Sequence, residues 1–149
     1  MAMVGTYALG VALIPKYLSQ NKALQISAVI GLVFSFCIIS TTGFTSVLFV
    51  AALGIANALV WPAVWPLTLD GLGRHTKTAA AMLIMAISGG AIIPPLYGRI
   101  VDSGKESLID SGLGAADALA LASKESYYIL IPCYLIIFGF AGFVKRLRK

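Results

Sequence analysis

The chain has 149 residues, of which 59% are hydrophobic and only 11% are charged, and its mean hydropathy is +0.92. A soluble domain is roughly a quarter charged, so this composition is typical of a membrane protein. The net charge of +5 does not indicate a nucleic-acid partner, because the basic residues lie in short loops and at the C-terminus, the pattern that orients helices in a lipid bilayer.

The apolar residues form runs of about twenty, the length that crosses about 30 Å of hydrocarbon at about 1.5 Å per residue. We therefore expect an all-α membrane protein with five transmembrane helices. The expected spans cover residues 1–18, 23–40, 47–69, 78–100 and 127–144. The first is short for a full span, and we interpret it as a helix that has lost part of its start.

We expect residues 102–126 to form one long polar loop between the last two spans, and within it ADALALASK favours a short amphipathic surface helix. With five spans, the loops at 15–22 and 70–77 and the C-terminal tail share one side, which carries eight Lys and Arg residues against one Asp. The other side carries three basic and five acidic residues. The positive-inside rule then predicts a multi-pass protein of the plasma (inner) membrane, with a cytoplasmic C-terminus and residues 102–126 outside.

Motifs of soluble enzymes are absent from the sequence, which has no P-loop, no Gly-x-Ser-x-Gly and no His or Cys at metal-ligand spacing. We therefore expect no enzyme activity, no cofactor and no metal site. Cys37 and Cys133 lie inside apolar spans and are expected to be packing residues. No Asp or Glu lies inside any expected span, so the titratable group that proton coupling needs would have to lie outside this chain.

In the third span, Asn57, Trp61 and Trp65 recur every four residues, which places them on one face of a continuous helix. An amide offers donors and an acceptor, and an indole offers a flat face and one N–H donor. This combination suits a sugar, with polar partners for its hydroxyls and an aromatic plate for its C–H face. The alternatives are that Asn57 bonds a neighbouring helix, that Trp65 is an interfacial anchor, and that Trp61 is ordinary core packing.

Helix breakers interrupt both the third and the fourth span. They are Pro62, Pro66, Gly89, Gly90, Pro94 and Pro95. A proline removes the hydrogen bond to the carbonyl four residues earlier, which for Pro94 is that of Gly90. A kink or broken turn is therefore expected in the fourth span, with the freed carbonyls facing protein or a watery cavity. The alternative is that the glycines serve only close helix packing. Ser88, near mid-span, is either a further cavity residue or a packing serine.

Together these motifs are recognisable. The segment GIANALVWPAVWPLTLDGLGRHTK, followed by SGGAIIPPLYG, resembles the fucose permease and glucose/galactose transporter family of the major facilitator superfamily. That family carries Gly-x-x-Asn-x-x-x-aromatic-Pro in its tenth helix and Gly-Gly-Ala-Ile-Ile-Pro-Pro in its eleventh. Here the first motif matches Gly54, Asn57, Trp61 and Pro62, and the tryptophans are most similar to the glucose/galactose branch.

The resemblance implies that residues 1–149 are a partial C-terminal transmembrane domain, similar to helices eight to twelve of a twelve-helix hexose carrier. Such a carrier works by ion-coupled symport with alternating access. The implied partners are a hexose, the lipid bilayer, and a coupling ion, either proton or sodium, bound in the missing N-terminal half. Thr6 departs from the family by replacing an arginine, and Tyr97 stands where some members have glutamine.

Two functions are therefore to be compared. In the carrier, Asn57 and Trp61 would contact the sugar, with Trp65 and Ser88 as further candidates, and the glycines and prolines of the fourth span would let it bend. The competing hypothesis is a complete small five-span membrane protein that acts as a structural or assembly partner without transport.

Overall fold

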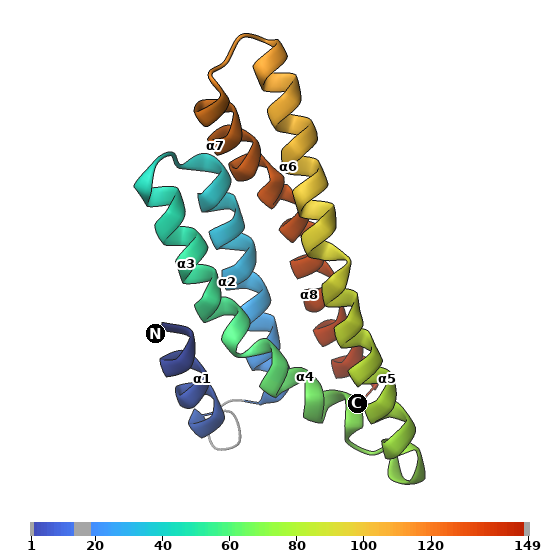
Figure 1. The fold of residues 1–149 in the computed structure, drawn as a ribbon. Helices are drawn as coiled ribbons and strands as arrows, with labels where there is room; N and C mark the ends of the chain where they lie inside the picture. The colour runs from blue at the N-terminus through green and yellow to red at the C-terminus, as the bar shows by residue number, and fades with distance from the viewer. Residues whose placement is uncertain (1, 14–18, 148–149) are drawn as a thin grey trace.

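The computed structural model describes residues 2–13 and 19–147, and no strand occurs among them. Its α-helices are α1 (Ala2–Leu13), α2 (Gln20–Ser40), α3 (Phe44–Ala58), α4 (Val60–Leu69), α5 (Thr76–Ile87), α6 (Ile93–Asp110), α7 (Ala115–Glu125) and α8 (Leu130–Leu147) (Figure 1). Short 3-10 helices are η1 (Gly73–His75), η2 (Ser88–Ala91) and η3 (Ser126–Ile129). The expected loop around Lys16 and the basic residues Arg148 and Lys149 lie outside the described residues.

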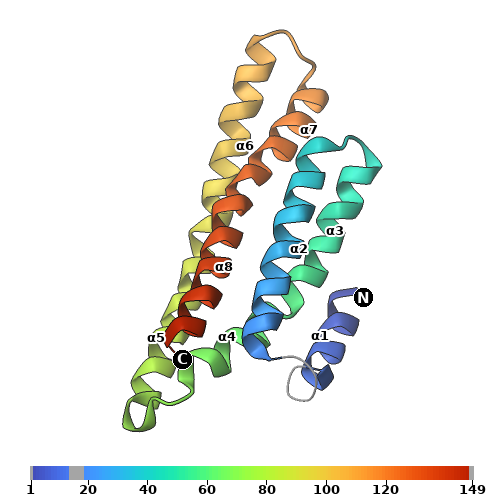
Figure 2. The same ribbon diagram turned by 180° about the vertical axis from the view of Figure 1, so that it is seen from behind.

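Helix α2 is the centre of the packing. It contacts α3, α4 and α8, and both ribbon views place it between α3 and α8 (Figures 1 and 2). One buried cluster joins its first turns to α4 and α8, and consists of Ala23, Leu24, Ala63, Leu67, Ala141 and Val144. A second cluster nearer its other end consists of Ile38, Leu53 and Tyr134. Many of these side chains are small, which lets helix backbones approach closely in a membrane.

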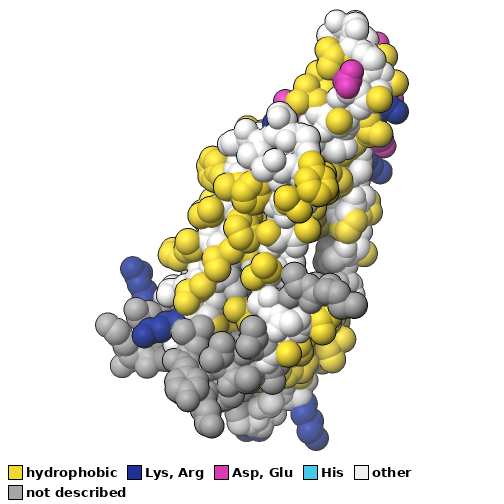
Figure 3. Space-filling model, turned by 90° about the vertical axis from the view of Figure 1, so that its left-hand side faces the viewer, with side chains coloured by type: hydrophobic (Ala, Val, Ile, Leu, Met, Phe, Trp, Pro, Cys, Tyr) yellow, Lys and Arg dark blue, Asp and Glu magenta, His cyan; other side chains and the backbone are white. Residues whose placement is uncertain are grey.

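Among the described residues, three helical segments are long and apolar enough to cross a bilayer: Gln20–Ser40, Phe44–Leu69 and Ala115–Val144. On the face drawn in Figure 3, hydrophobic side chains cover the middle, and charged side chains lie toward the two ends. Large apolar side chains such as Phe36 and Phe143 are 58% and 60% exposed, which suits contact with lipid. The expected span 78–100 is not among these three, and the expected span 1–18 lies partly outside the described residues. The five-span prediction is therefore supported for three spans.

The third expected span is divided into two helices. α3 ends at Ala58 and α4 begins at Val60, with Leu59 between them, and α4 turns away from the line of α3 (Figure 1). Pro62 has no N–H and so cannot bond the carbonyl of Ala58, which is where the hydrogen-bond ladder fails. The interruption expected in the third span is therefore present. Because it falls between Asn57 and the first tryptophan, the single continuous helix assumed for the shared face of Asn57, Trp61 and Trp65 is not observed.

The fourth expected span is also interrupted. α5 ends at Ile87, η2 covers Ser88–Ala91, and α6 begins at Ile93. Pro94 and Pro95 lie in the first turn of α6, where a missing N–H costs no helical hydrogen bond and the fixed φ suits a helix start. The interruption predicted from the spacing of glycines and prolines is present, and it is a turn of 3-10 helix.

The polar segment 102–126 is a helical hairpin rather than an irregular loop. α6 continues without interruption to Asp110, and α7 covers the expected amphipathic helix. The change from apolar to polar residues at Asp102 ends the expected span but not the helix, because the polar residues up to Asp110 are compatible with helix. The turn comes only at Gly112, whose φ of 98° is one that glycine adopts without strain. In both ribbon views the hairpin extends past the ends of α2 and α3.

Candidate functional site

The two tryptophans lie together on α4. Their ring centroids are 5.5 Å apart and their planes are inclined at 49°, because residues four apart on a helix lie one above the other. Trp61 is 44% exposed, so a large part of its indole surface is open to a ligand or to another part of the protein. The expected pairing of the two side chains is therefore found.

A groove beside the tryptophans has a volume of about 470 Å³. Its walls come from α1, α4 and α5, and its lining residues are Tyr7, Trp61, Pro62, Trp65, Pro66, Ile84 and Ile87. None of these seven described residues is charged at neutral pH, so the groove favours a neutral ligand. The polar groups available to a ligand are the indole N–H groups and the phenolic hydroxyl of Tyr7. Four of the ten predicted site and hinge residues therefore meet at one place.

Asn57 does not line this groove. Its side-chain Oδ1 accepts a hydrogen bond of 3.0 Å from the hydroxyl of Tyr134 on α8. The expected shared face of Asn57, Trp61 and Trp65 depended on one continuous helix, and the division at Leu59 separates the amide from the indoles. The bond to a neighbouring helix, one of the two interpretations of Asn57, is therefore observed, and the sugar contact stays a prediction. The amide NH₂ group is a separate pair of donors, and Asn57 is exposed.

The position of Tyr134 depends on a glycine. A Cβ atom added at Gly31 of α2 would collide with the ring of Tyr134, which is only 3% exposed. The ring therefore lies directly against the backbone of α2, and its hydroxyl reaches α3 beyond. Gly31, Tyr134 and Asn57 connect three helices at one level.

Ser88 and the glycine–proline segment lie at a different place on the surface. Ser88 is exposed and begins η2, whereas Ile84 and Ile87 are the residues of this stretch that line the tryptophan groove. Gly90, Pro94 and Pro95 are not groove residues either; they form the interruption and the first turn after it. Their roles in binding and bending stay predictions.

Sequence reasoning missed Tyr7 and Tyr134. Both are lone hydroxyl-bearing aromatics in apolar segments, and a buried tyrosine hydroxyl usually finds a hydrogen-bond partner. That signal was available for Tyr134, but it does not identify the partner. Tyr7 becomes relevant only once α1 is placed beside α4 and α5.

Comparison with known proteins identifies transporters as relatives. The glucose/galactose transporter of Brucella abortus (biovar 1, strain 9-941) is 35% identical over 102 residues, which cover 68% of this chain and 24% of that protein. A Helicobacter pylori (strain J99) protein, provisionally named glucose/galactose transporter, is 31% identical over 140 residues, 94% of this chain and 31% of that protein. The L-fucose-proton symporter of Haemophilus influenzae is 32% identical over 126 residues, 83% of this chain and 23% of that protein.

The chain thus spans 24% and 31% of the length of the first two of these relatives. No family model matches it, and no solved structure matches it. Its relatives are transporters rather than enzymes, and three of its helical segments are suited to a bilayer.

These findings define a multi-pass membrane protein whose relatives are transporters. The chain belongs to the fucose permease and glucose/galactose transporter family of the major facilitator superfamily, as its motifs indicated.

Proposed function

We propose that this chain is the C-terminal part of a hexose transporter, similar to helices eight to twelve, which moves a glucose- or galactose-like sugar by ion-coupled symport. The names of its relatives support a sugar substrate, and the share of their length that it spans supports a larger protein. In this proposal the chain forms one side of a central cavity, and alternating access comes from rocking of the two halves of the carrier around a site near the midplane.

The observation that carries the proposal is the uncharged aromatic groove on α4. A hexose is neutral, and its C–H face stacks on an indole while its hydroxyls need donors and acceptors. The exposed ring of Trp61 provides such a face, Trp65 lies beside it, and Tyr7 adds a hydroxyl. Since the groove of about 470 Å³ is open, the missing half would supply the opposite wall.

Asn57 and Ser88 complete the proposed sugar contacts. Asn57 uses its oxygen to bond Tyr134, so it would offer its NH₂ group to a sugar hydroxyl while being held in place by the tyrosine. Ser88 is exposed at the start of η2, and its hydroxyl would reach a sugar from the fourth span. Both contacts lie outside the tryptophan groove and would extend the site toward the middle of the membrane.

The interruption between α5 and α6 is proposed as the hinge. Because Pro94 and Pro95 have no N–H, the carbonyls of Gly90 and Ala91 are not bonded by the helix, and such groups must face protein or water in a membrane. Pro62 and Pro66 would act in the same way in α4. A hinge of this kind lets one end of a span move while the other end stays packed.

Ion coupling would be supplied from elsewhere in the carrier. The expected spans contain no Asp or Glu, and a proton-coupled carrier needs a titratable group within the membrane. We therefore place the site of the coupling ion, proton or sodium, in the N-terminal half. In the same proposal the C-terminus and the loop 70–77 are cytoplasmic and the α6–α7 hairpin is outside.

Replacement of Trp61 tests the proposal. In the complete carrier, Trp61→Ala should lower hexose uptake by about fivefold, since an aromatic contact contributes about 1 kcal/mol, while Trp61→Phe should keep most of it. Phe143→Ala is the matched control, because it removes an exposed aromatic ring of α8. Uptake that is unchanged in Trp61→Ala, at equal amounts of protein in the membrane, would remove the groove from the sugar pathway.

A second candidate is a five-span protein that assembles with a partner and does not transport. The observation in its favour is that α5 has no buried residue. It exposes Met82 and Met85, at 63% and 64%, and this apolar surface could pack against another chain. The coding region upstream of Met1 separates the two candidates. An open frame encoding about seven further helices supports the carrier, and a start signal at Met1 supports the smaller protein.

A further inference from the structure

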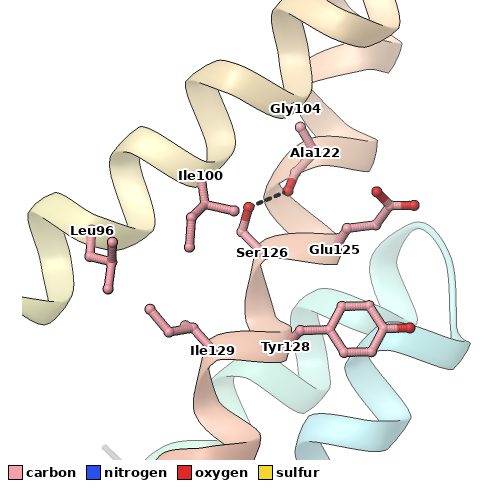
Figure 4. A pocket seen from close by; sticks show the side chains of 8 residues that line it. All are labelled: Leu96, Ile100, Gly104, Ala122, Glu125, Ser126, Tyr128 and Ile129. Carbon is pink, nitrogen blue, oxygen red and sulfur yellow. Dashed lines mark hydrogen bonds between the residues drawn. The ribbon is translucent and has the colours of Figure 1, made fainter.

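A second groove lies between α6 and η3, away from the tryptophans. It has a volume of about 520 Å³ and is lined by Leu96, Ile100, Gly104, Ala122, Glu125, Ser126, Tyr128 and Ile129 (Figure 4). Leu96, Ile100 and Gly104 recur every four residues and so form one wall along α6, about 12 Å long at about 1.5 Å per residue. None of these residues lines the groove beside the tryptophans.

The interior of this groove is apolar, and its outer end is narrow. A Cβ atom added at Gly104 would lie 3.3 Å from the Cβ atom of Ala122, so α6 and α7 approach each other closely there. The hydroxyl of Ser126 donates a hydrogen bond of 2.7 Å to the carbonyl of Ala122 and is thereby used within the helix. A polar, water-soluble ligand would find few partners, whereas a hydrocarbon chain would find a continuous wall.

The groove crosses the expected boundary of the membrane. Leu96, Ile100 and Ile129 belong to the expected spans 78–100 and 127–144, whereas Gly104 and Ala122 belong to the polar segment between them. Glu125 and Tyr128 lie on the edge opposite Leu96 and Ile100 (Figure 4), and the ring of Tyr128 is 56% exposed. An occupant would therefore have its apolar part in the bilayer and its polar end at the level of the headgroups.

Charge decides which headgroup fits. Glu125 is the one charged side chain among the eight lining residues. The segment 102–126 around it contains five carboxylates and two lysines, so this end repels an anion and attracts a cation. We propose that the groove binds one acyl chain of a phospholipid whose headgroup carries an ammonium group, with that ammonium beside Glu125.

Competition between two lipids tests the headgroup. Phosphatidylethanolamine and phosphatidylglycerol with identical acyl chains are added to the purified, delipidated protein, and bound lipid is counted by native mass spectrometry. We expect a preference of about fivefold for phosphatidylethanolamine, the effect of one charge pair at about 4 Å in water, and its loss in Glu125→Gln. Glu106→Gln is the control, since this exposed carboxylate on α6 is not a lining residue. Equal retention of both lipids by the unaltered protein would overturn the headgroup assignment.

A groove-filling substitution tests the position. Ile100→Trp should abolish retention of this lipid, and Leu96→Phe should weaken it. Ile109→Trp, on the same helix but outside the lining, should leave it unchanged. Circular dichroism checks that each variant is folded. If Ile100→Trp does not fold, Leu96→Phe provides the test of the groove. Retention equal to that of the unaltered protein in a folded groove variant would overturn the groove as the binding site.

Discussion

The hydroxyl of Tyr134 donates a hydrogen bond to Oδ1 of Asn57 across 3.0 Å, although the two residues are 77 positions apart in the chain. The bond joins α8 to α3 past the backbone of α2 at Gly31. It gives Asn57 a structural task in addition to the sugar contact proposed for it. The two tasks predict different results for substitutions at the two ends of the bond.

Tyr134→Phe removes the hydrogen bond and leaves the amide of Asn57 in place. We expect a loss of about 0.5 to 1 kcal/mol in the free energy of unfolding, the usual effect of one hydrogen bond between membrane helices. Thermal unfolding of the purified protein measures it. Tyr128→Phe is the control because this ring is 56% exposed, and an equal loss there would show that the bond to Asn57 contributes nothing.

Asn57→Ala removes both the bond and the proposed sugar contact. If Asn57 binds sugar, hexose uptake by the complete carrier should fall by about fivefold or more beyond the fall seen in Tyr134→Phe, because a lost polar contact costs about 1 kcal/mol or more. Uptake assays on both variants at matched membrane levels make the comparison. Equal falls would assign Asn57 to helix packing alone.

Gly31→Ala places a methyl group where the ring of Tyr134 lies. The ring must move, so we expect loss of the Asn57 bond and about 1 to 3 kcal/mol of destabilisation from overpacking, measured by thermal unfolding. Gly139→Ala on α8 is the matched control, because the space around Gly139 is open among the described residues. Equal stability of the two variants would contradict the close approach of α2 and Tyr134.

Pro94→Ala combined with Pro95→Ala restores two backbone N–H groups at the start of α6. If the interruption at Ser88–Ala91 is a hinge, transport should slow several-fold while sugar affinity changes little, since hinge residues act on the rate of the conformational step. Uptake kinetics and quenching of tryptophan fluorescence by sugar report the two quantities. Pro132→Ala, in the first turn of α8, is the control and should leave both unchanged.

The proposed orientation is tested with single cysteines. In intact cells, a membrane-impermeant maleimide should label Asp110→Cys in the hairpin but not Arg74→Cys in η1, because the positive-inside rule places the basic loop in the cytoplasm. Both positions are exposed, so both should react after the cells are lysed. Labelling of Arg74→Cys in intact cells would reverse the topology.

Local rules predicted the helix interruptions. A proline cannot bond the carbonyl four residues earlier, and this rule needs no knowledge of the fold. Applied to Pro94 it predicts an interruption at Gly90, which is where the 3-10 turn η2 lies. The same rule applied to Pro62 points to Ala58, directly before the division at Leu59, but the face shared by Asn57 and the tryptophans was derived as if no division existed. A break in a helix changes which residues share a face. Periodicity alone does not predict this change, because it assumes one continuous helix.

Tertiary contacts between helices could not be predicted from the sequence. The partner of Asn57 and the wall that Tyr7 contributes depend on how α8 and α1 pack, which no spacing along the chain encodes. The polar segment 102–126 was expected as a loop because hydropathy locates the edge of a membrane and not the end of a helix. Only the turn at Gly112 ends α6 in a way that backbone preference explains.

The continuity of α6 makes it a rigid lever. It runs from the interruption at η2 to the tip of the hairpin over 18 residues, about 27 Å at about 1.5 Å per residue. A bend of about 10° at its inner end would carry its tip about 5 Å sideways. A fluorophore pair with one member near Asp110 would thus report, from the aqueous side, a movement that begins at the interruption inside the expected fourth span.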